Sequence, residues 1–442
     1  MRRYLIICLL SWSGVAFSAP KPAMQKHLQP TVFALTMVMI HDVVNPPAAS
    51  RFYSYCLLGS HAIVAKKDPA VVAPERLIRQ LPDLVAQVPA SCNHQMAALY
   101  CMLETGRMML PSGSMLEADI QKLTANLRKE GYSLAETEAA RQAGQQVAKA
   151  VAAYAADDNY QKLSSRLRYR PTKKDGYWYP TPPGYIEAIE PHWRIIRPML
   201  IDSCSQFKPE PPVPFDAETT SPFGKLVQEV YQTGRNLTPE QRLIASYWDC
   251  NPFAINTAGH MSIGFKKISP GGHWINITSQ VAAQAKVPFE QAVYMHSLVA
   301  MTLRDSFISC WDEKFRSNRI RPETVINRLI DVRWQPLLQT PPFPEYTSGH
   351  SVISSAVAEV LTYCLGDSFR FTDTTEEIFE LPARSFTSFR QAAEEASVSR
   401  LYGGIHFRDA IENGQKQGRA IGRYIIYRVK NAGGGPLLST RK

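Results

Sequence analysis

Three short stretches of the chain combine basic side chains, imidazoles and glycines in a pattern that suits the binding of an anion. They are the pair Lys314 and Arg321, the triplet Ser348, Gly349 and His350, and the pair Arg400 and His406. Arginine forks and a lysine ammonium hold oxyanions through charge-assisted hydrogen bonds. An imidazole gives or accepts a proton near neutral pH. Brought together by a fold, these residues predict a site for a trianionic oxyanion with two acid–base groups.

The triplet lies where the sequence changes from proline-rich to helix-like, within PPFPEYTSGHSVISSAVAEVLTYC (residues 341–364). We therefore expect a helix to begin at Ser348. A helix N-terminus carries free backbone N–H groups and a partial positive charge, and a glycine lets an anion approach the backbone closely. Ser348 would add a hydroxyl donor and His350 a proton. Such a triplet is common by itself, and the alternative is a capped helix with a surface histidine.

The other two stretches also lie at predicted helix ends. Pro322 follows Arg321 directly and disfavours helical geometry for it, so the guanidinium can turn toward a shared site. Gly403 and Gly404 precede a second predicted helix start, where His406 stands. Taken singly, these residues would be surface charges and an ordinary helix histidine. Together with the triplet they favour one common site.

Helical periodicity dominates the sequence around these stretches. Apolar residues recur at spacings of three and four from Thr31 to about Leu167 and again from Thr238 to about Val429. Between them, residues 171–222 hold eleven of the 32 prolines together with many aromatic residues, too many for a disordered linker. We predict a mostly α fold of two packed helix bundles, joined by an ordered Pro-rich connection, with the anion site in the C-terminal bundle.

The first residues have the form of a secretory signal. Arg2 and Arg3 precede an apolar stretch and a small-residue cleavage site that ends at Ser18, so we expect residues 1–18 to be removed and the protein to be exported, to the periplasm or beyond. A membrane anchor is the alternative, but the apolar stretch is shorter than the roughly 20 residues that a spanning helix needs. The rest would divide into a helical region 19–167, the connection 168–225, a helical domain 226–430 and a flexible tail 431–442.

Charge and cysteine content narrow the class of partner. Loss of the leader would leave 47 of the 49 basic residues against 39 acidic ones, and seven of the eight cysteines. The basic residues are scattered, so we predict small-molecule substrates and no nucleic-acid partner. The cysteines fit no zinc pattern, and in an exported chain they permit up to three disulfides. His260 and His273 are expected to be plain loop histidines. After the leader, no stretch is long and uncharged enough to span a membrane.

The three stretches resemble, in order and spacing, the signature of the superfamily of type 2 phosphatidic acid phosphatases and vanadium-dependent haloperoxidases. The matching motifs are Lys-x6-Arg-Pro at residues 314–322, Ser-Gly-His at 348–350 and Ser-Arg-x5-His at 399–406. Weaker likenesses to bacterial vanadium haloperoxidase-like proteins occur in MIHDVVNPPAASRFYSY and YWDCNPFAINTAGH. The resemblance implies a mostly helical fold of two bundles, with the anion site in the C-terminal one.

Two positions depart from this signature. Thr347 stands where the family usually has proline, a change that should keep the backbone before Ser348 extended. The family's acidic residue after the last histidine is replaced by Ala410. We therefore expect that the residues that hold the site's side chains in place, without contacting the oxyanion, could include Asp409, Asp249 and Asp305.

The resemblance implies one of two reactions, because vanadate and the phosphoryl-transfer transition state share a trigonal-bipyramidal shape. In a phosphatase, His406 would attack phosphorus and His350 would protonate the leaving alcohol. In a haloperoxidase, His406 would be the metal ligand of a bound vanadate, His350 would help hydrogen peroxide bind, and Lys314 would polarise the peroxide oxygen that a halide attacks. In both reactions the oxyanion would be held by Lys314, Arg321, Ser348, Gly349 and Arg400.

Two aromatic residues favour the haloperoxidase. Trp311 lies one helical turn before Lys314, and Phe343 lies seven residues before His350. Vanadium chloroperoxidases, which this stretch resembles, carry aromatic residues there on the halide side of the site. We therefore predict an exported haloperoxidase that uses vanadate, hydrogen peroxide and halide. A soluble phosphatase of phosphate monoesters, which needs no cofactor, is the alternative, and a non-enzymatic anion-binding protein is a third.

Overall fold

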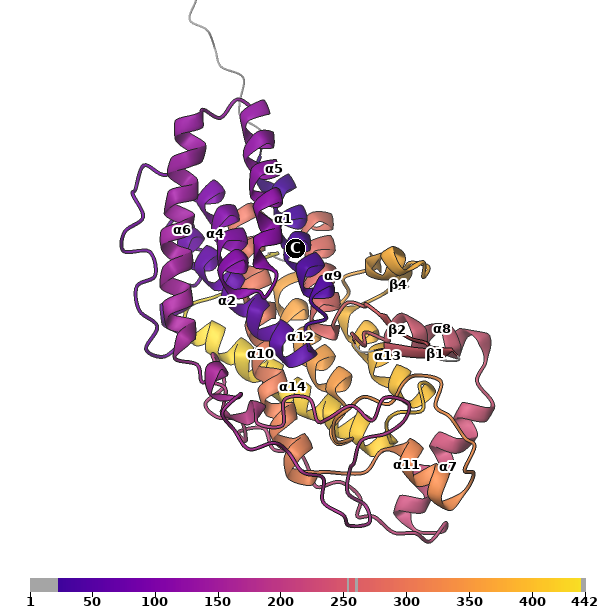
Figure 1. The fold of residues 1–442 in the computed structure, drawn as a ribbon. Helices are drawn as coiled ribbons and strands as arrows, with labels where there is room; N and C mark the ends of the chain where they lie inside the picture. The colour runs from indigo at the N-terminus through magenta and orange to yellow at the C-terminus, as the bar shows by residue number, and fades with distance from the viewer. Residues whose placement is uncertain (1–22, 253, 259–260, 439–442) are drawn as a thin grey trace, which may run out of the picture.

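The computed structural model describes residues 23–252, 254–258 and 261–438. These residues form two helix bundles with two short antiparallel hairpins, which confirms the mostly α fold (Figure 1). The predicted leader and His260 lie outside the described residues, so export stays a prediction. Within the described ranges, no helix has both the length and the apolar character needed to cross a membrane.

In the N-terminal bundle, in indigo and magenta in Figure 1, side-chain caps begin some of the helices. The Asn45 side chain accepts a hydrogen bond from the Ala48 amide at the start of α2, and Ser133 and Glu136 form a capping box at α6. The last α-helix ends at Ala156, short of the predicted boundary near residue 167, and turns and a 3-10 helix at Tyr160–Lys162 follow it. The helices are α1 (Gln25–His41), α2 (Pro46–Ala65), α3 (Pro74–Leu77), α4 (His94–Met109), α5 (Leu116–Lys129) and α6 (Leu134–Ala156).

The C-terminal half carries the three motifs. Its helices are α7 (Pro222–Arg235), α8 (Pro239–Tyr247), α9 (Pro270–Gln284), α10 (Phe289–Ser317), α11 (Pro322–Leu329), α12 (Gly349–Leu365), α13 (Phe389–Tyr402) and α14 (Arg408–Asn431). Strand β1 (Ala254–Ala258) pairs with β2 (Met261–Phe265), and β3 (Phe371–Asp373) pairs with β4 (Arg384–Phe386). Helix α10 packs on α2 of the other bundle, so a single hydrophobic core runs through both bundles.

Helices α12 and α14 pack very closely, and this contact places the second motif beside the third. Glycines recur every fourth residue on α14, at 414, 418 and 422. A Cβ atom at Gly418 would collide with the carbonyl oxygen of Val352, and one at Gly422 would lie 2.6 Å from that of Ala356. Only glycine lets the two backbones approach this closely. The contact fixes the first turn of α12 against the first turn of α14.

The Pro-rich connection is irregular in backbone but packed along its length. Its Trp178 and Trp193 side chains are fully buried. The Trp178 amide donates to the Asn318 carbonyl at the end of α10, and the Trp193 ring packs edge-on against Tyr160 at 6.0 Å. The connection therefore touches both halves of the molecule.

The last described residues differ from the predicted flexible tail. Helix α14 ends at Asn431, and the chain then folds back onto the core. The amides of Leu437 and Leu438 both donate to the Cys364 carbonyl, and the Tyr363 hydroxyl donates to the Gly434 carbonyl. The run of three glycines thus makes a close turn against α12, since a side chain at Gly434 would meet Val429 at 2.6 Å.

Candidate active site

A cavity of about 40 Å³ lies where the three motifs meet. One water needs roughly 10–15 Å³, so this space suits a group of a few heavy atoms. Residues of the second and third motifs line it, together with Trp311, which precedes the first motif, and with the two segments that carry the weaker sequence likenesses. The wall contains Trp311, Phe343, Gly349, His350, Arg400 and His406, with Asp249, Cys250 and Pro46 among the others.

Arg321 is held with one nitrogen free. It is the residue before α11, in extended geometry (φ −85°, ψ 152°), as its position before Pro322 predicts. Its Nε donates to the Phe343 carbonyl and its Nη1 to the Ile405 carbonyl, both at 2.9 Å. Its Nη2 is buried and has no hydrogen-bond partner among the described residues. A buried guanidinium N–H without a partner is costly, so it marks a position for an acceptor.

Lys314 sits on α10 behind the aromatic wall, and its ammonium binds the loop that leads into α12. Nζ donates to the carbonyls of Pro344, Glu345 and Thr347 at 3.0, 3.1 and 2.6 Å. These bonds use all three of its donors, so here Lys314 orders the loop and contributes charge to the site. The predicted direct contact of Lys314 with an oxyanion requires one of these bonds to be exchanged.

His406 is oriented by an acid that sequence reasoning missed. Its Nδ1 lies 2.9 Å from Glu345 Oε1, and its Nε2 lies 3.2 Å from Arg321 Nη1. Burial, followed by the nearby cations Arg321 and Lys314, holds the pKa of His406 well below its ordinary value. The imidazole is therefore neutral. With the proton on Nδ1 donated to Glu345, the Nε2 lone pair is left on the side of the cations.

Glu345 itself is fixed by two further donors. The Phe407 amide donates to Oε1 at 2.9 Å, and Arg319 Nε donates to Oε2 at 2.7 Å. Arg319 also binds Asp409 through two nitrogens, at 2.6 and 2.7 Å. The side chain of Asp409 is thus linked to His406 through Arg319 and Glu345, as an outer partner of the site. The position of the family's acidic residue is held by Ala410, one residue after Asp409. The Ala410 carbonyl accepts a hydrogen bond from the Ser348 amide.

The second motif begins α12 as predicted. Ser348 is the capping residue, and its Oγ accepts from the Ser351 amide and hydroxyl, at 3.3 and 2.8 Å. Both bonds leave the hydroxyl proton of Ser348 available as a donor. Within 4 Å, a Cβ at Gly349 would meet only Trp311 Cζ3, at 3.8 Å, so the helix start stays uncovered toward the cavity.

His350 faces the cavity with an unpartnered nitrogen. The ring makes a hydrogen bond to the backbone of Trp248, and burial, with the charge of Arg400, holds its pKa well below the ordinary value. Its Nε2 has no hydrogen-bond partner among the described residues. His350 is therefore a neutral base at the cavity, and its position at a helix start, where a cation is unfavourable, acts in the same direction.

Arg400 completes the polar wall from α13. Its Nε donates to Ser399 Oγ at 2.9 Å and its Nη2 to the Trp248 carbonyl at 2.7 Å. Asp249 follows Trp248 and raises the pKa of Arg400 through its charge, although burial lowers that pKa overall. Asp249 pairs with Lys267 at 2.6 Å. It is thus an outer partner of the site, as the sequence predicts.

Asp305 lies elsewhere in the molecule. Its carboxylate accepts the backbone amides of Met199, Leu200 and Ile201 at 2.9, 2.6 and 2.8 Å. It thereby anchors the Pro-rich connection to α10. The sequence-based role of Asp305 at the anion site is wrong, because its face of α10 points to the connection.

The cavity is cationic and lacks direct neutralisation. In the described part of the chain, Lys314, Arg321 and Arg400 form no ion pair with a carboxylate. Burial lowers the pKa of Lys314 to about 7 and that of Arg321 to about 9. Buried charges are normally paired. A bound oxyanion would supply the negative charge that these three cations lack.

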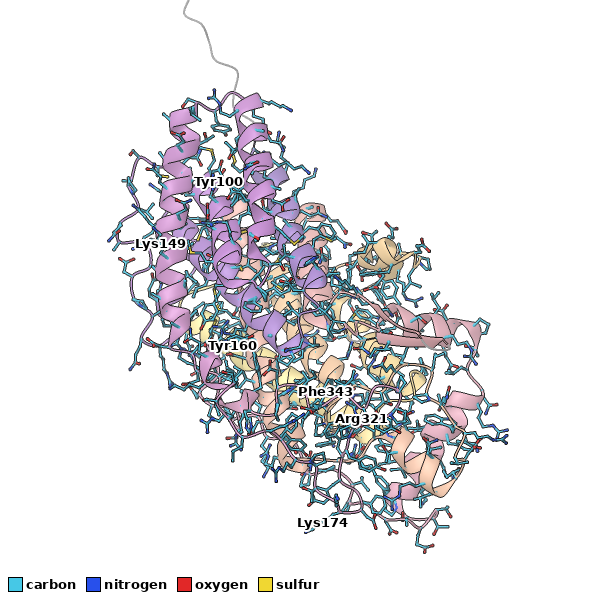
Figure 2. All side chains as sticks on the ribbon, viewed as in Figure 1. Tyr100, Lys149, Tyr160, Lys174, Arg321 and Phe343 are labelled. Carbon is cyan, nitrogen blue, oxygen red and sulfur yellow. The ribbon has the colours of Figure 1, made fainter. Side chains whose placement is uncertain are left out.

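An aromatic pair lies against two of these cations. The rings of Trp311 and Phe343 lie 4.9 Å apart. Lys314 Nζ and the Arg321 guanidinium each lie 5.1 Å from the Phe343 centroid, and Figure 2 shows Arg321 and Phe343 side by side. Trp311 Nε1 donates to the Ile189 carbonyl of the Pro-rich connection at 3.2 Å. The cations and the apolar rings therefore meet at one small space, as the spacing of Trp311 and Phe343 predicts.

Comparisons with known proteins agree with this geometry. The family model described as the VCPO second helical-bundle domain matches residues 294–434. The crystal structure of a bacterial vanadium-dependent iodoperoxidase matches with a TM-score of 0.85 and 39% sequence identity, over 93% of this chain and 97% of that one. The chain belongs to the vanadium haloperoxidase family. Family membership makes it a haloperoxidase-like oxidoreductase, as the three motifs predict.

A second similarity shows the fold alone. A bacterial vanadium-dependent chloroperoxidase in its holo form has a TM-score of 0.67 at 16% identity, over 95% of this chain and 99% of that one. A search of curated protein sequences finds no significant match. The fold thus persists where most of the sequence has changed.

Proposed function

We propose that this protein oxidises iodide with hydrogen peroxide at a vanadate bound in the cavity. The observation that carries the proposal is the neutral His406, whose Nε2 lone pair faces unpaired cations beside the Trp311–Phe343 pair. The choice of iodide is supported by the 39% identity to a protein described as an iodoperoxidase. The balanced reaction takes iodide, hydrogen peroxide and one proton to hypoiodous acid and water.

The donors around the cavity fit vanadate. Two buried polar atoms there, Arg321 Nη2 and His350 Nε2, have no partner among the described residues. We infer that His406 Nε2 would be the nitrogen ligand, and that the oxygens would be held by Lys314, Arg321, Ser348, Gly349 and Arg400. Bound vanadate would supply a Lewis acid that activates hydrogen peroxide toward oxygen transfer to a halide.

The two histidines have separate tasks in this proposal. Glu345 accepts the Nδ1 proton of His406 and so keeps the Nε2 lone pair directed at the cavity. His350 is neutral, and its unpartnered Nε2 would accept a proton from hydrogen peroxide as the peroxide binds. Lys314, with a pKa of about 7, would return a proton to the leaving oxygen.

The aromatic pair would serve the halide. Iodide is large and weakly hydrated, so apolar rings that exclude water cost it little solvation. The wall formed by Trp311 and Phe343 suits such an ion, while the polar residues beside it suit the oxyanion. The two walls divide one cavity into a halide side and an oxyanion side.

A phosphatase remains the second candidate, because the same neutral Nε2 of His406 is a competent nucleophile toward phosphorus. The aromatic wall argues against it, since apolar rings suit a weakly hydrated halide better than a phosphate ester.

The decisive experiment compares both activities in the wild-type protein. We expect vanadate-loaded protein to form triiodide from iodide and hydrogen peroxide, and vanadate-free protein to be inactive toward a chromogenic phosphate monoester. Ester hydrolysis without halide oxidation would instead identify the phosphatase. Vanadate binding with neither activity would identify a non-enzymatic member of the family.

Shrinking the aromatic wall should separate the two sides of the cavity. We expect Trp311→Ala to reduce iodide turnover about tenfold or more, because water enters the halide side, and to change vanadate affinity by less than about threefold. Steady-state rates and a vanadate titration of the same preparations provide the test. Trp178→Ala, which removes an equally buried indole outside the cavity, is the control. Equal losses in turnover and vanadate affinity would show that Trp311 only supports the fold.

A further inference from the structure

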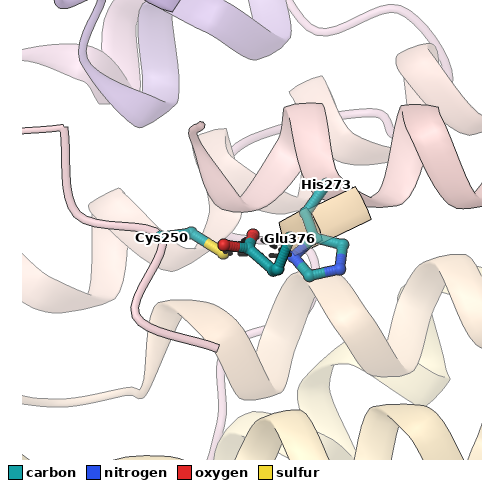
Figure 3. Close-up of side chains that lie close together, drawn as sticks. All are labelled: Cys250, His273 and Glu376. Carbon is teal, nitrogen blue, oxygen red and sulfur yellow. Dashed lines mark hydrogen bonds and ion pairs between the residues drawn. The ribbon is translucent and has the colours of Figure 1, made fainter. Parts of the chain in front are cut away.

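A second group of chemically active side chains lies just outside the anion site. Cys250, His273 and Glu376 come from three separate segments, namely the loop after α8, the first turn of α9 and the 3-10 helix at Thr375–Phe379. All three are buried. Figure 3 shows the thiol and the carboxylate converging on one edge of the imidazole. None of the proposed steps of halide oxidation uses them.

The three potential ligand atoms are mutually close. Cys250 Sγ lies 3.3 Å from His273 Nδ1, Glu376 Oε1 lies 3.1 Å from the same nitrogen, and Sγ and Oε1 are 4.0 Å apart. Zinc bonds are about 2.3 Å to sulfur and about 2.0–2.2 Å to nitrogen and oxygen, which puts neighbouring ligand atoms of a tetrahedral ion about 3.4–3.6 Å apart. The observed triangle differs from such a face by about half an ångström or less at each edge.

The outer nitrogen of the imidazole is already oriented for metal binding. His273 Nε2 lies 2.6 Å from Asp373 Oδ2, and the other oxygen of Asp373 accepts the Thr375 amide at 2.9 Å. A carboxylate that accepts the outer N–H of a ligating histidine fixes the tautomer that presents the inner nitrogen to a metal. The Trp248 ring stacks on the imidazole at 4.6 Å and holds its plane.

We propose that Cys250, His273 and Glu376 bind one divalent, thiolate-preferring cation, most simply Zn²⁺, at a site distinct from the vanadate site. Thiolate, imidazole and carboxylate together are a donor set that zinc accepts, and three protein ligands leave one position for water. Binding releases the thiol proton of Cys250 and the Nδ1 proton of His273 to solvent and changes no oxidation state. No short sequence pattern predicts this site, because His273 lies 23 residues after Cys250 and Glu376 lies 103 residues after His273.

The location gives the cation a structural task. Cys250 lines the anion cavity, and two residues earlier the Trp248 carbonyl accepts Arg400 Nη2 at 2.7 Å. A cation that ties Cys250 to α9 and to the 3-10 helix would fix this loop, and with it the orientation of Arg400. Metal binding at the cluster would thereby stabilise the polar wall of the neighbouring site.

The test uses the purified full-length protein freed of metals by a chelator and then titrated with Co²⁺. We expect one equivalent of Co²⁺ to bind and to give the near-ultraviolet absorption of a cobalt–thiolate bond. Added Zn²⁺ should then displace the Co²⁺ and remove this absorption. Cys250→Ser should abolish this absorption. Glu376→Gln should weaken Zn²⁺ binding by more than about 100-fold, and Asp373→Asn by about 10- to 100-fold.

Two control variants separate the zinc proposal from the vanadate proposal. Cys92→Ser removes a half-buried thiol of the N-terminal bundle and should leave Co²⁺ and Zn²⁺ binding unchanged. His406→Ala should also keep the zinc site, so failure of the vanadate proposal is distinguishable from failure of this one. Absence of a cobalt–thiolate band and of stoichiometric Zn²⁺ binding in the folded wild type would overturn the proposal, and the cluster would then be an ion-paired histidine next to a thiol.

Discussion

Replacing His406 with alanine should abolish vanadate binding and halide oxidation while leaving the fold intact. The imidazole is neutral, and its Nε2 lies 3.2 Å from Arg321 Nη1 at the cavity. Its loss removes the proposed nitrogen ligand of the metal, whereas the cations remain and still attract the oxyanion weakly. We expect vanadate affinity to fall by at least about 100-fold, more than removal of an outer partner costs.

A vanadate titration followed by fluorescence, together with triiodide formation at saturating peroxide, measures both effects. His41→Ala is a suitable control, because that histidine is exposed and pairs only with Asp42 in the N-terminal bundle. Circular dichroism should show unchanged helix content for both variants. An unaltered vanadate affinity in His406→Ala would remove the ligand assignment, and with it the proposed division of roles between the two histidines.

Neutralising Glu345 should weaken the site without removing any group that touches the oxyanion. Glu345→Gln keeps the size of the side chain, but its amide turns an N–H toward either His406 or Arg319, both of which donate to the carboxylate now. Outer partners of metal-binding histidines contribute about 10- to 100-fold to affinity. We expect a loss of vanadate affinity in that range.

The same change should shift the pH profile. Burial lowers the pKa of Lys314 to about 7, and the charge of Glu345 is among the groups that raise it. Without that charge the pKa falls below about 7, so Lys314 loses its proton at a lower pH. Activity on the alkaline side should therefore decline at lower pH in Glu345→Gln than in the wild type.

A merely structural role for Glu345 would lower stability and activity together and leave the pH profile where it is. Glu412→Gln provides the matched control, since Glu412 is exposed and lies 4.0 Å from Arg408 on the surface of α14. If Glu345→Gln lost activity with an unmoved profile, the residue would not position His406 electrostatically.

Local chemistry made several features of this protein predictable. Ser348 caps α12 and Arg321 is extended before Pro322, because capping and the steric effect of proline act over one or two residues. Periodicity predicts most helices, since each buries an apolar face or is buried on all sides. The three motifs also pointed to the superfamily of type 2 phosphatidic acid phosphatases and vanadium haloperoxidases, and the positions of Trp311 and Phe343 favoured the haloperoxidases.

Cysteine pairing was outside the reach of such local signals. The sequence permitted up to three disulfides, but all seven cysteines of the described chain are free thiols. Likewise His273, expected in a loop, is buried in the first turn of α9. Composition gives the number of thiols and imidazoles, whereas their partners depend on which helices pack together.

The connections among site residues were decided only by tertiary packing. Glu345 reaches His406 across 61 residues, and Asp409 meets Arg319 across 90, so neither contact leaves a periodic signal in the chain. In the sequence, Glu345 is a single acidic residue in the loop before Ser348, and the sequence does not show which residue it contacts. Close packing of α12 on the glycines of α14 brings these segments together, and the low dielectric of the resulting core then selects which carboxylate each cation and imidazole must bind.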